Sequence, residues 1–423
     1  MRAHSPTLRA LRVVRPLGML AGAAAHAQPF GPLQQEARPF VRASEARAMG
    51  DAVAAVPDPE TAFFYNPAHL AYLPRPYRVT VAGLGAGLSS GVSDKYAYWR
   101  EELRPATNEG LDVIRETDYP RLEALYHGAL AVGRRQDVAR ATAYGPAVQA
   151  RLSMGDWDGA VGGGLFGTGA ARLRFSDGGA GLPYLDAYGQ ADVIVPVTAA
   201  ARIPRTPLAF GLTAALTHRR LTAKGALVET LDEDRAHLYV LSGTTLALDA
   251  GLHAADVLPG LDLGGAVYGL LGGGFRYRYR GQRIDLTGNG GDDDAAEIEA
   301  LEARFNSRRG HPTWRLGVAY RVPLPAEGTP ALDSVTLAAD YVSASTSEFE
   351  QPIEAHLRAG IRVAVTRVLS LRTGIRQGYL SFGTTLVVPG VELDYAYFGI
   401  EDGRVPGQLG RYNHHLRLRF GLF

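Results

Sequence analysis

The strongest constraint on the fold is a period-two alternation of apolar and polar residues, which runs through most of the chain after residue 77. In Ile353–Val363 the odd positions are apolar, while the even positions are Glu, His, Arg, Gly and Arg. As a β-strand, such a segment has one apolar and one charged face, because successive side chains point to opposite sides. Each strand therefore needs an apolar cover, either a second sheet or a lipid bilayer. The same alternation recurs in Trp314–Val322, Ser334–Tyr341, Leu369–Arg376, Val391–Phe398 and Leu416–Leu422.

The lengths of the strands and of their connections favour the bilayer. Many segments have about ten residues, the length with which a tilted strand crosses a membrane. The 14 predicted strands are 78–90, 144–154, 157–168, 187–201, 207–222, 246–254, 261–280, 312–322, 333–343, 353–364, 368–376, 378–388, 390–400 and 412–423. The long connections, each after an odd-numbered strand, are 91–143, 169–186, 223–245, 281–311 and 401–411. Membrane barrels sort short and long loops to opposite ends in this way, whereas a sandwich has no reason to do so.

We therefore predict an all-β fold, a 14-stranded antiparallel transmembrane β-barrel over residues 78–423. Its outer-loop insertions are 91–143, 223–245 and 281–311, and segments 95–104 and 119–131 have the composition of helices that cap the outer loops. The 20 tyrosines and 51 glycines suit a sheet protein with interfacial rings and many turns. A net charge of +1 gives no reason to expect nucleic acid, and the absence of cysteine favours an oxidising compartment.

The N-terminus has the order of a secretory signal peptide. Four arginines between residues 2 and 15 precede the apolar run 17–25, and Ala25-His26-Ala27 forms a small-x-small cleavage site. Residues 1–27 are predicted to be removed on export; a basic disordered tail is the alternative. No later segment has 18 uninterrupted apolar residues, so no helical membrane anchor is expected.

Two stretches near the N-terminus carry a family resemblance. Glu45–Ala54 reads EARAMGDAVA, and Asn66–Ala71 reads NPAHLA. They resemble the "AR-x-MG-x-A-x-VA" and "YNPA-x-LA" stretches with which the FadL-like and PorV-like outer-membrane β-barrels open. Leu246–Leu252 and Leu393–Tyr397 are similar to strands of the same families. Asp51 departs from the pattern, because those families usually have a second glycine there.

The resemblance implies a fourteen-stranded barrel in the bacterial outer membrane, whose N-terminal residues 28–77 enter the lumen as a plug or hatch. Phe63 would then bury against the wall, and Asn66 would turn the chain by bonding its own backbone ahead of the proline. Both a movable hatch and a fixed plug agree with the sequence. The plug motif residues are Met49, Gly50, Asn66, Pro67 and Ala68.

Charged residues on the polar strand faces are expected to line the lumen, because a charge facing lipid near the midplane costs about 2–4 kcal/mol. One interpretation is an ion-pair network that stiffens the lumen. The other is an anion-binding path in which Arg358, Arg372 or Arg376 clamps a carboxylate through two parallel hydrogen bonds. The predicted inward residues are Asp249, Arg315, Arg321, Asp340, Glu354, His356, Arg358, Arg362, Arg372, Arg376, Glu392, Asp394, Arg417 and Arg419.

No catalytic constellation stands out, because the chain has no Cys nucleophile, no Walker loop and no His-Glu-x-x-His. We predict neither an enzyme nor a cofactor. Asp285–Gly290 matches the first half of an EF-hand loop, but Ala296 stands where the bidentate glutamate belongs, so no metal site is assigned. The alternative is an outer loop in which Asp294 caps a helix from Ala295 to about Asn306.

Two functions follow from these predictions. The resemblance to the fatty-acid channel implies a channel or transporter for small hydrophobic or amphipathic molecules. The PorV-like relatives imply instead a non-transporting outer-membrane scaffold, an accessory of protein secretion or surface assembly. The expected partners are outer-membrane lipid, the barrel-assembly machinery and either a hydrophobic small molecule or a secretion partner, with no nucleic acid. A barrel hydrolase is disfavoured because no nucleophile–base pair is visible.

Overall fold

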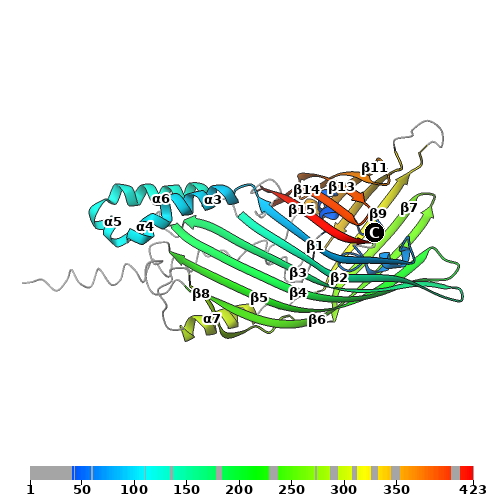
Figure 1. The fold of residues 1–423 in the computed structure, drawn as a ribbon, viewed down its shortest axis with the longest axis horizontal. Helices are drawn as coiled ribbons and strands as arrows, with labels where there is room; N and C mark the ends of the chain where they lie inside the picture. The colour runs from blue at the N-terminus through cyan, green and yellow to red at the C-terminus, as the bar shows by residue number, and fades with distance from the viewer. Residues whose placement is uncertain are drawn as a thin grey trace, which may run out of the picture.

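The computed structural model describes residues 41–422 apart from 42, 59–60, 110, 134–136, 178–182, 228–236, 272–273, 286–293, 307–311, 325–331, 344–352 and 402–409. All strands in these ranges belong to one antiparallel sheet, which closes on itself as a barrel (Figure 1). The last strand pairs with the first, in a register that sets Leu418 opposite Leu84. The sheet has fifteen strands in fourteen positions around the ring, and the predicted fourteen-stranded closed barrel is confirmed.

One position in the ring is shared by two strands, β7 and β8, which the sequence predicts as the single strand 261–280. Both pair with β6: β7 with its last part, and β8 with its first part. Residues 274–277, between them, are not in a strand. The strands are β1 (Tyr77–Ser89), β2 (Asp137–Met154), β3 (Trp157–Asp177), β4 (Pro183–Arg202), β5 (Leu208–Leu227), β6 (His237–Leu258), β7 (Leu261–Leu271), β8 (Arg278–Asp285), β9 (Thr313–Val322), β10 (Ser334–Val342), β11 (Leu357–Ala364), β12 (Leu369–Arg376), β13 (Tyr379–Val388), β14 (Val391–Glu401) and β15 (Gly410–Leu422).

The two sides of the wall differ in height. Strands β2–β6 have 18–22 residues, whereas β9–β14 have 8–11. In Figure 1 the long strands continue toward the helices well past the ends of the short ones. At about 3.3 Å per residue, the long strands exceed what a membrane crossing needs.

The predicted long connections 169–186 and 223–245 are therefore wrong in large part. β3 runs to Asp177 and β4 begins at Pro183, while β5 runs to Leu227 and β6 begins at His237. Beyond the bilayer both faces of a strand meet polar surroundings, so the alternation that identifies a strand fades there. A smaller error lies at the predicted start of strand 353–364, where Ile353–Ala355 forms the 3-10 helix η5 before β11.

The outer face of the wall is apolar. Leu212 is 47% exposed and Leu216 50%, while Thr213 and Thr217 between and beside them are fully buried. Leu246 and Leu316 are exposed in the same way, at 60% and 56%. A continuous apolar belt on a closed barrel has no protein cover in the described ranges, and a lipid bilayer is the surroundings that it suits.

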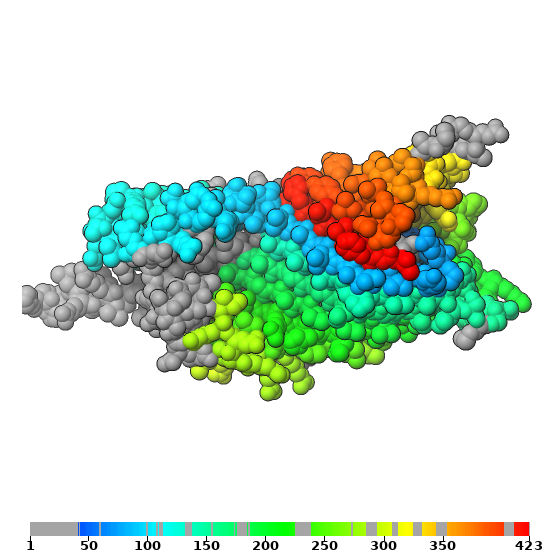
Figure 2. Space-filling model, in the orientation of Figure 1, coloured from blue at the N-terminus to red at the C-terminus, as the bar shows by residue number. Residues whose placement is uncertain are grey.

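Helices occupy the N-terminal segment and the long-loop end. The helical insertion after β1 lies beyond most of the strand ends (Figures 1 and 2), and its Leu103 and Leu125 share an apolar cluster with Phe175 of β3. None of the helices in the described ranges has the length and apolarity with which a helix crosses a membrane. The helices are α2 (Ser44–Ala48), η2 (Pro67–Tyr72), α3 (Val92–Tyr98), η3 (Trp99–Leu103), α4 (Arg104–Glu109), α5 (Leu111–Thr117), α6 (Tyr119–Gly133) and α7 (Ala295–Asn306).

Two helix predictions are confirmed. The segments predicted at 95–104 and 119–131 lie in α3–α4 and α6, and α7 has the predicted bounds. The Asp294 carboxylate accepts hydrogen bonds from the backbone N–H groups of Ala296 and Glu297, both at 3.0 Å, which is the expected cap. Most of the partial EF-hand match, residues 286–293, lies outside the described residues.

Candidate functional site

The N-terminal segment, defined as the described residues 43–58 and 61–76, packs against the inner face of the wall. Ala46, Ala52 and Ala54 have no exposed surface. The segment comes closest at inward-facing glycines of seven strands, where a Cβ atom would collide with atoms of residues 48–68. A side chain at these positions would push the segment away, so the glycines let backbone meet backbone. They are Gly211, Gly251, Gly264, Gly317, Gly360, Gly374 and Gly383.

Asn66 forms the turn that the sequence predicts. Its side-chain oxygen accepts a hydrogen bond from the Ala68 N–H at 3.1 Å and so caps η2, whose first residue is Pro67. Proline suits that position because its missing N–H would have had no partner in the helix. The Asn66 amide nitrogen donates to the carbonyl oxygens of Ala54, at 2.8 Å, and Leu252, at 3.1 Å. One side chain thus joins two parts of the segment to β6.

The turn after α2 contains the other predicted motif residues. Met49 is 2% exposed, and Gly50 and Asp51 have φ angles of +64° and +66°. Aspartate is among the residues that tolerate this left-handed conformation. The Asp51 carboxylate accepts hydrogen bonds from the Tyr65 hydroxyl, at 3.3 Å, and from Arg376 in β12. The residue that departs from the family pattern therefore forms an ion pair with the wall.

A buried ionic cluster fixes α2 to β14 and β15. Arg417 is 1% exposed and forms ion pairs with Glu45 in α2 and with Asp394, the latter at 2.7 Å. Arg419 forms an ion pair with Glu392, whose oxygen also lies 3.3 Å from Arg417. Burial alone would raise the pKa of Glu45, but Arg417 and Arg419 together hold it well below its usual range. The carboxylate of α2 is therefore charged and tied to the wall.

Three carboxylates of this cluster could be taken for a metal site. Glu45, Glu392 and Asp394 each offer an oxygen within 4.8 Å of the others. The two guanidinium groups that pair with them already supply positive charge, so a cation would have to displace Arg417 or Arg419. The arrangement is that of an ion-pair network.

A second set of polar contacts holds residues 51–54, which follow α2. The Asp340 carboxylate in β10 accepts hydrogen bonds from the backbone N–H groups of Val53 and Ala54, both at 2.9 Å. Arg315 in β9 lies 3.3 Å from the same carboxylate and donates to the Asp51 carbonyl at 2.7 Å. The backbone of residues 51–54 is therefore paired with side chains of the short strands.

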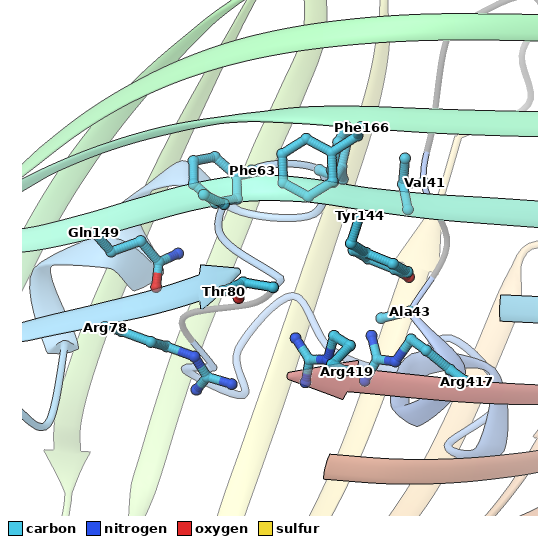
Figure 3. Close-up of a pocket in the computed structure, with 12 residues that line it drawn as sticks. Val41, Ala43, Phe63, Arg78, Thr80, Tyr144, Gln149, Phe166, Arg417 and Arg419 are labelled. Carbon is cyan, nitrogen blue, oxygen red and sulfur yellow. The ribbon is translucent and has the colours of Figure 1, made fainter. Parts of the chain in front are cut away.

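A pocket lies between the N-terminal segment, β1–β3 and β15 (Figure 3). Figure 3 shows the rings of Phe63 and Phe166 on one side and the guanidinium groups of Arg78, Arg417 and Arg419 across from them. Phe166 packs against Phe63, with 5.5 Å between ring centroids, and also against Phe64 and Tyr144. The remaining lining residues are Val41, Ala43, Thr80, Ala147 and Gln149.

The pocket is amphipathic but small. Its volume of about 30 Å³ has room for about one water molecule and not for an organic solute. Because Ala43, Phe63 and Phe64 form part of its lining, movement of the N-terminal segment would enlarge it.

The other predicted lumen residues mostly brace the wall. Asp249 accepts a hydrogen bond from the Gly269 N–H at 2.8 Å. Arg358 donates to the carbonyl oxygens of Ala355 and Leu357, at 2.7 and 2.8 Å, and Arg372 donates to Thr385, which in turn donates to Asp394. None of the three arginines proposed to clamp an anion lines the pocket.

Three predicted inward residues are not buried. Arg321 has a side chain that is 50% exposed and forms an ion pair with Asp256 at the short-turn end. Glu354 lies in η5 and is exposed, and Arg362 is partly exposed. Each lies near the end of a strand, where the inner face opens to solvent.

Sequence reasoning missed several residues that matter here. Glu45 and Asp51 lie within the motif, yet nothing in the sequence assigns them to Arg417 and Arg376. Tyr144 and Phe166 line the pocket, although the sequence shows only that they belong to strands. One sequence signal could have located the contact between the N-terminal segment and the wall: glycine recurs at inward-facing positions of several strands.

His69 and His253 form a buried pair that was also missed. His69 in η2 lies 2.9 Å through Nε2 from the Ala54 carbonyl oxygen and 3.1 Å through Nδ1 from the Thr61 hydroxyl. Its ring packs edge-on against His253, with 5.3 Å between centroids. Burial lowers the pKa of His69 well below its ordinary value of 6.5, and His253 acts in the same direction. His69 is therefore neutral in the folded protein at pH 7.

These features define a closed β-barrel with an apolar exterior and an N-terminal segment on its inner face. No protein-family model matches the chain, and no curated protein does either. Among solved structures it is similar to the Ralstonia pickettii toluene transporter TbuX, at 13% identity over 90% of this chain and 98% of that chain, with a TM-score of 0.46. It is also similar to the P. putida toluene transporter TodX (10% identity, 90% and 98% covered, TM-score 0.46) and to a Pseudomonas aeruginosa FadL homologue (11%, 91% and 98%, 0.44).

Proposed function

We propose that the protein is an outer-membrane channel for small hydrophobic or amphipathic molecules. The observation that carries this proposal is the pocket, in which an aromatic surface faces three guanidinium groups inside a barrel with an apolar exterior. Aromatic rings suit the apolar part of a solute, and arginine suits a carboxylate or another polar end. In this proposal residues 1–27 are a signal peptide and residues 28–77 form a plug.

The plug part of the proposal is supported by contacts of the N-terminal segment with opposite parts of the ring, the short strands and the long strands. Residues 45–54 pair with β9–β15, and η2 packs against β3–β6. A solute that crosses the barrel has to displace part of the segment, because the pocket beside it has room for only about one water molecule. Deletion of residues 28–77 is therefore expected to change uptake, and unchanged uptake of every solute tested would contradict the plug.

A pocket-filling variant tests the channel directly. Ala147 lines the pocket from β2, so Ala147→Phe fills the space that a solute needs. Labelled toluene, benzoate and octanoate are offered to cells that express the full chain and lack other hydrophobic channels. We expect uptake of at least one probe by the parent protein and about a tenfold loss in the variant, since blocking a contact worth about 1.4 kcal/mol changes an equilibrium tenfold.

The matched control is Ala143→Phe, four residues earlier in the same strand and exposed on the outer face. It adds the same side chain toward the lipid, and uptake should stay at the parent level. Equal losses in both variants would show a folding defect. Uptake by cells with the parent protein no faster than by cells without it would refute the channel.

A non-transporting scaffold is the second candidate. The observation that favours it is the helical extension α3–α6, which lies beyond most of the strand ends and could contact another protein (Figure 1). If the protein is a scaffold, deletion of residues 92–133 should abolish its activity in cells, and Ala147→Phe should leave that activity intact. If it is a channel, Ala147→Phe should lower solute uptake, and deletion of residues 92–133 should leave uptake intact.

A further inference from the structure

Four arginines form an exposed strip on the outer face of the wall near the long-loop end. The arginine strip, as we call it, consists of Arg220 in β5, Arg278 and Arg280 in β8, and Arg276 just before β8, all of them exposed. Arg220 is opposite Ser242 of β6, and Ser242 is opposite Arg278. Two strand spacings of about 4.8 Å therefore separate Arg220 from Arg278.

The strip faces away from the barrel interior. The neighbours of Arg220 along the strand, Arg219 and Leu221, are each 3% exposed, so the side chain between them points outward. The same holds in the segment leading into β8, where Phe275 and Tyr277 are 7% and 6% exposed.

The strip lies directly beyond the apolar belt. On β5 the outward residues change from Leu212 and Leu216, which are 47% and 50% exposed, to Arg220. Leu216 is opposite Leu246 of β6, which is 60% exposed. Four residues of strand, about 13 Å, separate Leu216 from Arg220, and strand tilt reduces this distance along the membrane normal. The arginines therefore lie at the level of the lipid headgroups, which add about 5–8 Å to each side of the hydrocarbon.

The charge of the strip is not neutralised by the part of the chain that the structure describes. Nearby carboxylates are committed elsewhere: Asp192 pairs with the inward Arg219 at 2.7 Å, and Glu297 pairs with Lys224 at 2.7 Å. The Glu302 carboxylate lies beside β8 and accepts a hydrogen bond from the Tyr279 N–H at 2.6 Å. Two exposed arginines at the short-turn end, Arg151 and Arg321, do have carboxylate partners, at 2.5 and 2.9 Å. The four arginines of the strip have no such carboxylate partner in the described ranges.

We infer that the arginine strip binds the phosphate groups of phosphorylated lipid headgroups in the leaflet at the long-loop end. The planar guanidinium matches phosphate through two parallel hydrogen bonds, and arginine is less strongly hydrated than lysine. Basic residues next to a membrane surface attract anionic lipids. This inference rests on the membrane location in the proposed function, but not on transport.

Lipid affinity is measured on the full chain in a non-ionic detergent. Fluorescent phosphatidic acid is the probe, and the zwitterionic phosphatidylcholine analogue is the comparison. The parent protein should bind phosphatidic acid more tightly, and added sodium chloride should weaken that binding. An arginine at a membrane surface contributes about fivefold in affinity, so Arg278→Gln should weaken binding by about that factor. Substituting all four arginines with glutamine should weaken it by about 600-fold, the product of four such factors.

The control variant is Arg121→Gln. Arg121 is an exposed arginine of α6, and its guanidinium pairs with Glu109 at 2.9 Å. The affinity of the Arg121→Gln variant for phosphatidic acid should equal that of the parent protein. Because the strip is exposed, the fourfold variant should keep the parent's heat-dependent gel mobility, which checks the fold.

Three results would overturn the inference: equal affinity of the parent for both lipids, parent-like affinity in the fourfold variant, or inorganic phosphate binding as tightly as the lipid. The last would assign the strip to a free anion. The readout is separate from uptake. If uptake fails while the parent still selects phosphatidic acid, the channel proposal alone is refuted.

Discussion

The two halves of the N-terminal segment contact the wall in different ways. The ionic half, residues 43–56, is tied to the short strands by Glu45 to Arg417, by Asp51 to Arg376, and by the Asp340 carboxylate to two backbone N–H groups. The apolar half, residues 61–73, packs three alanines and Leu70 against alanines of β3, β4 and β5. Its polar contacts are mainly between side chains and carbonyl oxygens, such as Asn66 to Leu252 and Arg202 to Ala71.

The two halves are therefore stabilised by different interactions, buried ion pairs in one and close packing of small residues in the other. Buried ion pairs contribute little relative to apolar packing while intact, but removal of one partner is costly because a charge is left without compensation. Close packing of small residues has no such dependence on charge, but it does not tolerate added volume. The ionic half should therefore respond to charge changes and the apolar half to volume changes.

The largest expected effect is in the ionic half. Arg417→Met leaves Glu45 and Asp394 buried without their cation, and we expect a loss of about 3–5 kcal/mol in the free energy of unfolding. Unfolding is followed by heat-dependent gel mobility, and detachment of the segment by hydrogen exchange of residues 44–54. Arg151→Met removes an exposed pair and should cost at most about 1 kcal/mol. Equal costs for the two variants would contradict the comparison.

A medium effect is expected in the apolar half. A Cβ at Gly211 would collide with the backbone of Pro67 and Ala68, so Gly211→Ala should cost about 1–3 kcal/mol. Hydrogen exchange should increase in residues 66–71 before it does in 44–54. Gly169→Ala is the control, because its Cβ would have a backbone oxygen at an ordinary 3.8 Å. If Gly169→Ala loosened η2 equally, close packing would not explain the effect.

The smallest expected effect is a pH dependence of the apolar half. The pKa of His69 is lowered in the folded protein from its ordinary value of 6.5, so the released segment binds the proton more tightly. The contribution of His69 to docking is therefore complete above about pH 6.5 and declines as the pH falls below it. Hydrogen exchange of residues 66–71, expressed relative to the intrinsic amide rate at each pH, should accelerate between pH 7 and pH 5. His69→Gln, which keeps a donor for the Ala54 carbonyl, should lose that acceleration, and an unchanged profile would refute this role of His69.

Much of the wall could be predicted because strand alternation is a local property. The outward leucines, the buried Arg417 and Asp394, and the Asn66 turn all follow from side-chain periodicity or from contacts within a few residues. The predictions failed where that local signal fades. Strands β3–β6 run on beyond the apolar belt, and the β7–β8 interruption replaces one predicted strand.

The sequence by itself therefore determined a closed fourteen-stranded wall, its apolar outside and its charged inside. A period of two requires only that neighbouring residues alternate, so no distant information is needed. Only the tertiary structure decided which inward charges meet. Glu45 and Arg417 are 372 positions apart, and Asp51 and Arg376 are 325 apart. Their pairing, the pocket beside Phe166 and the arginine strip depend on closure of the barrel and on strand register.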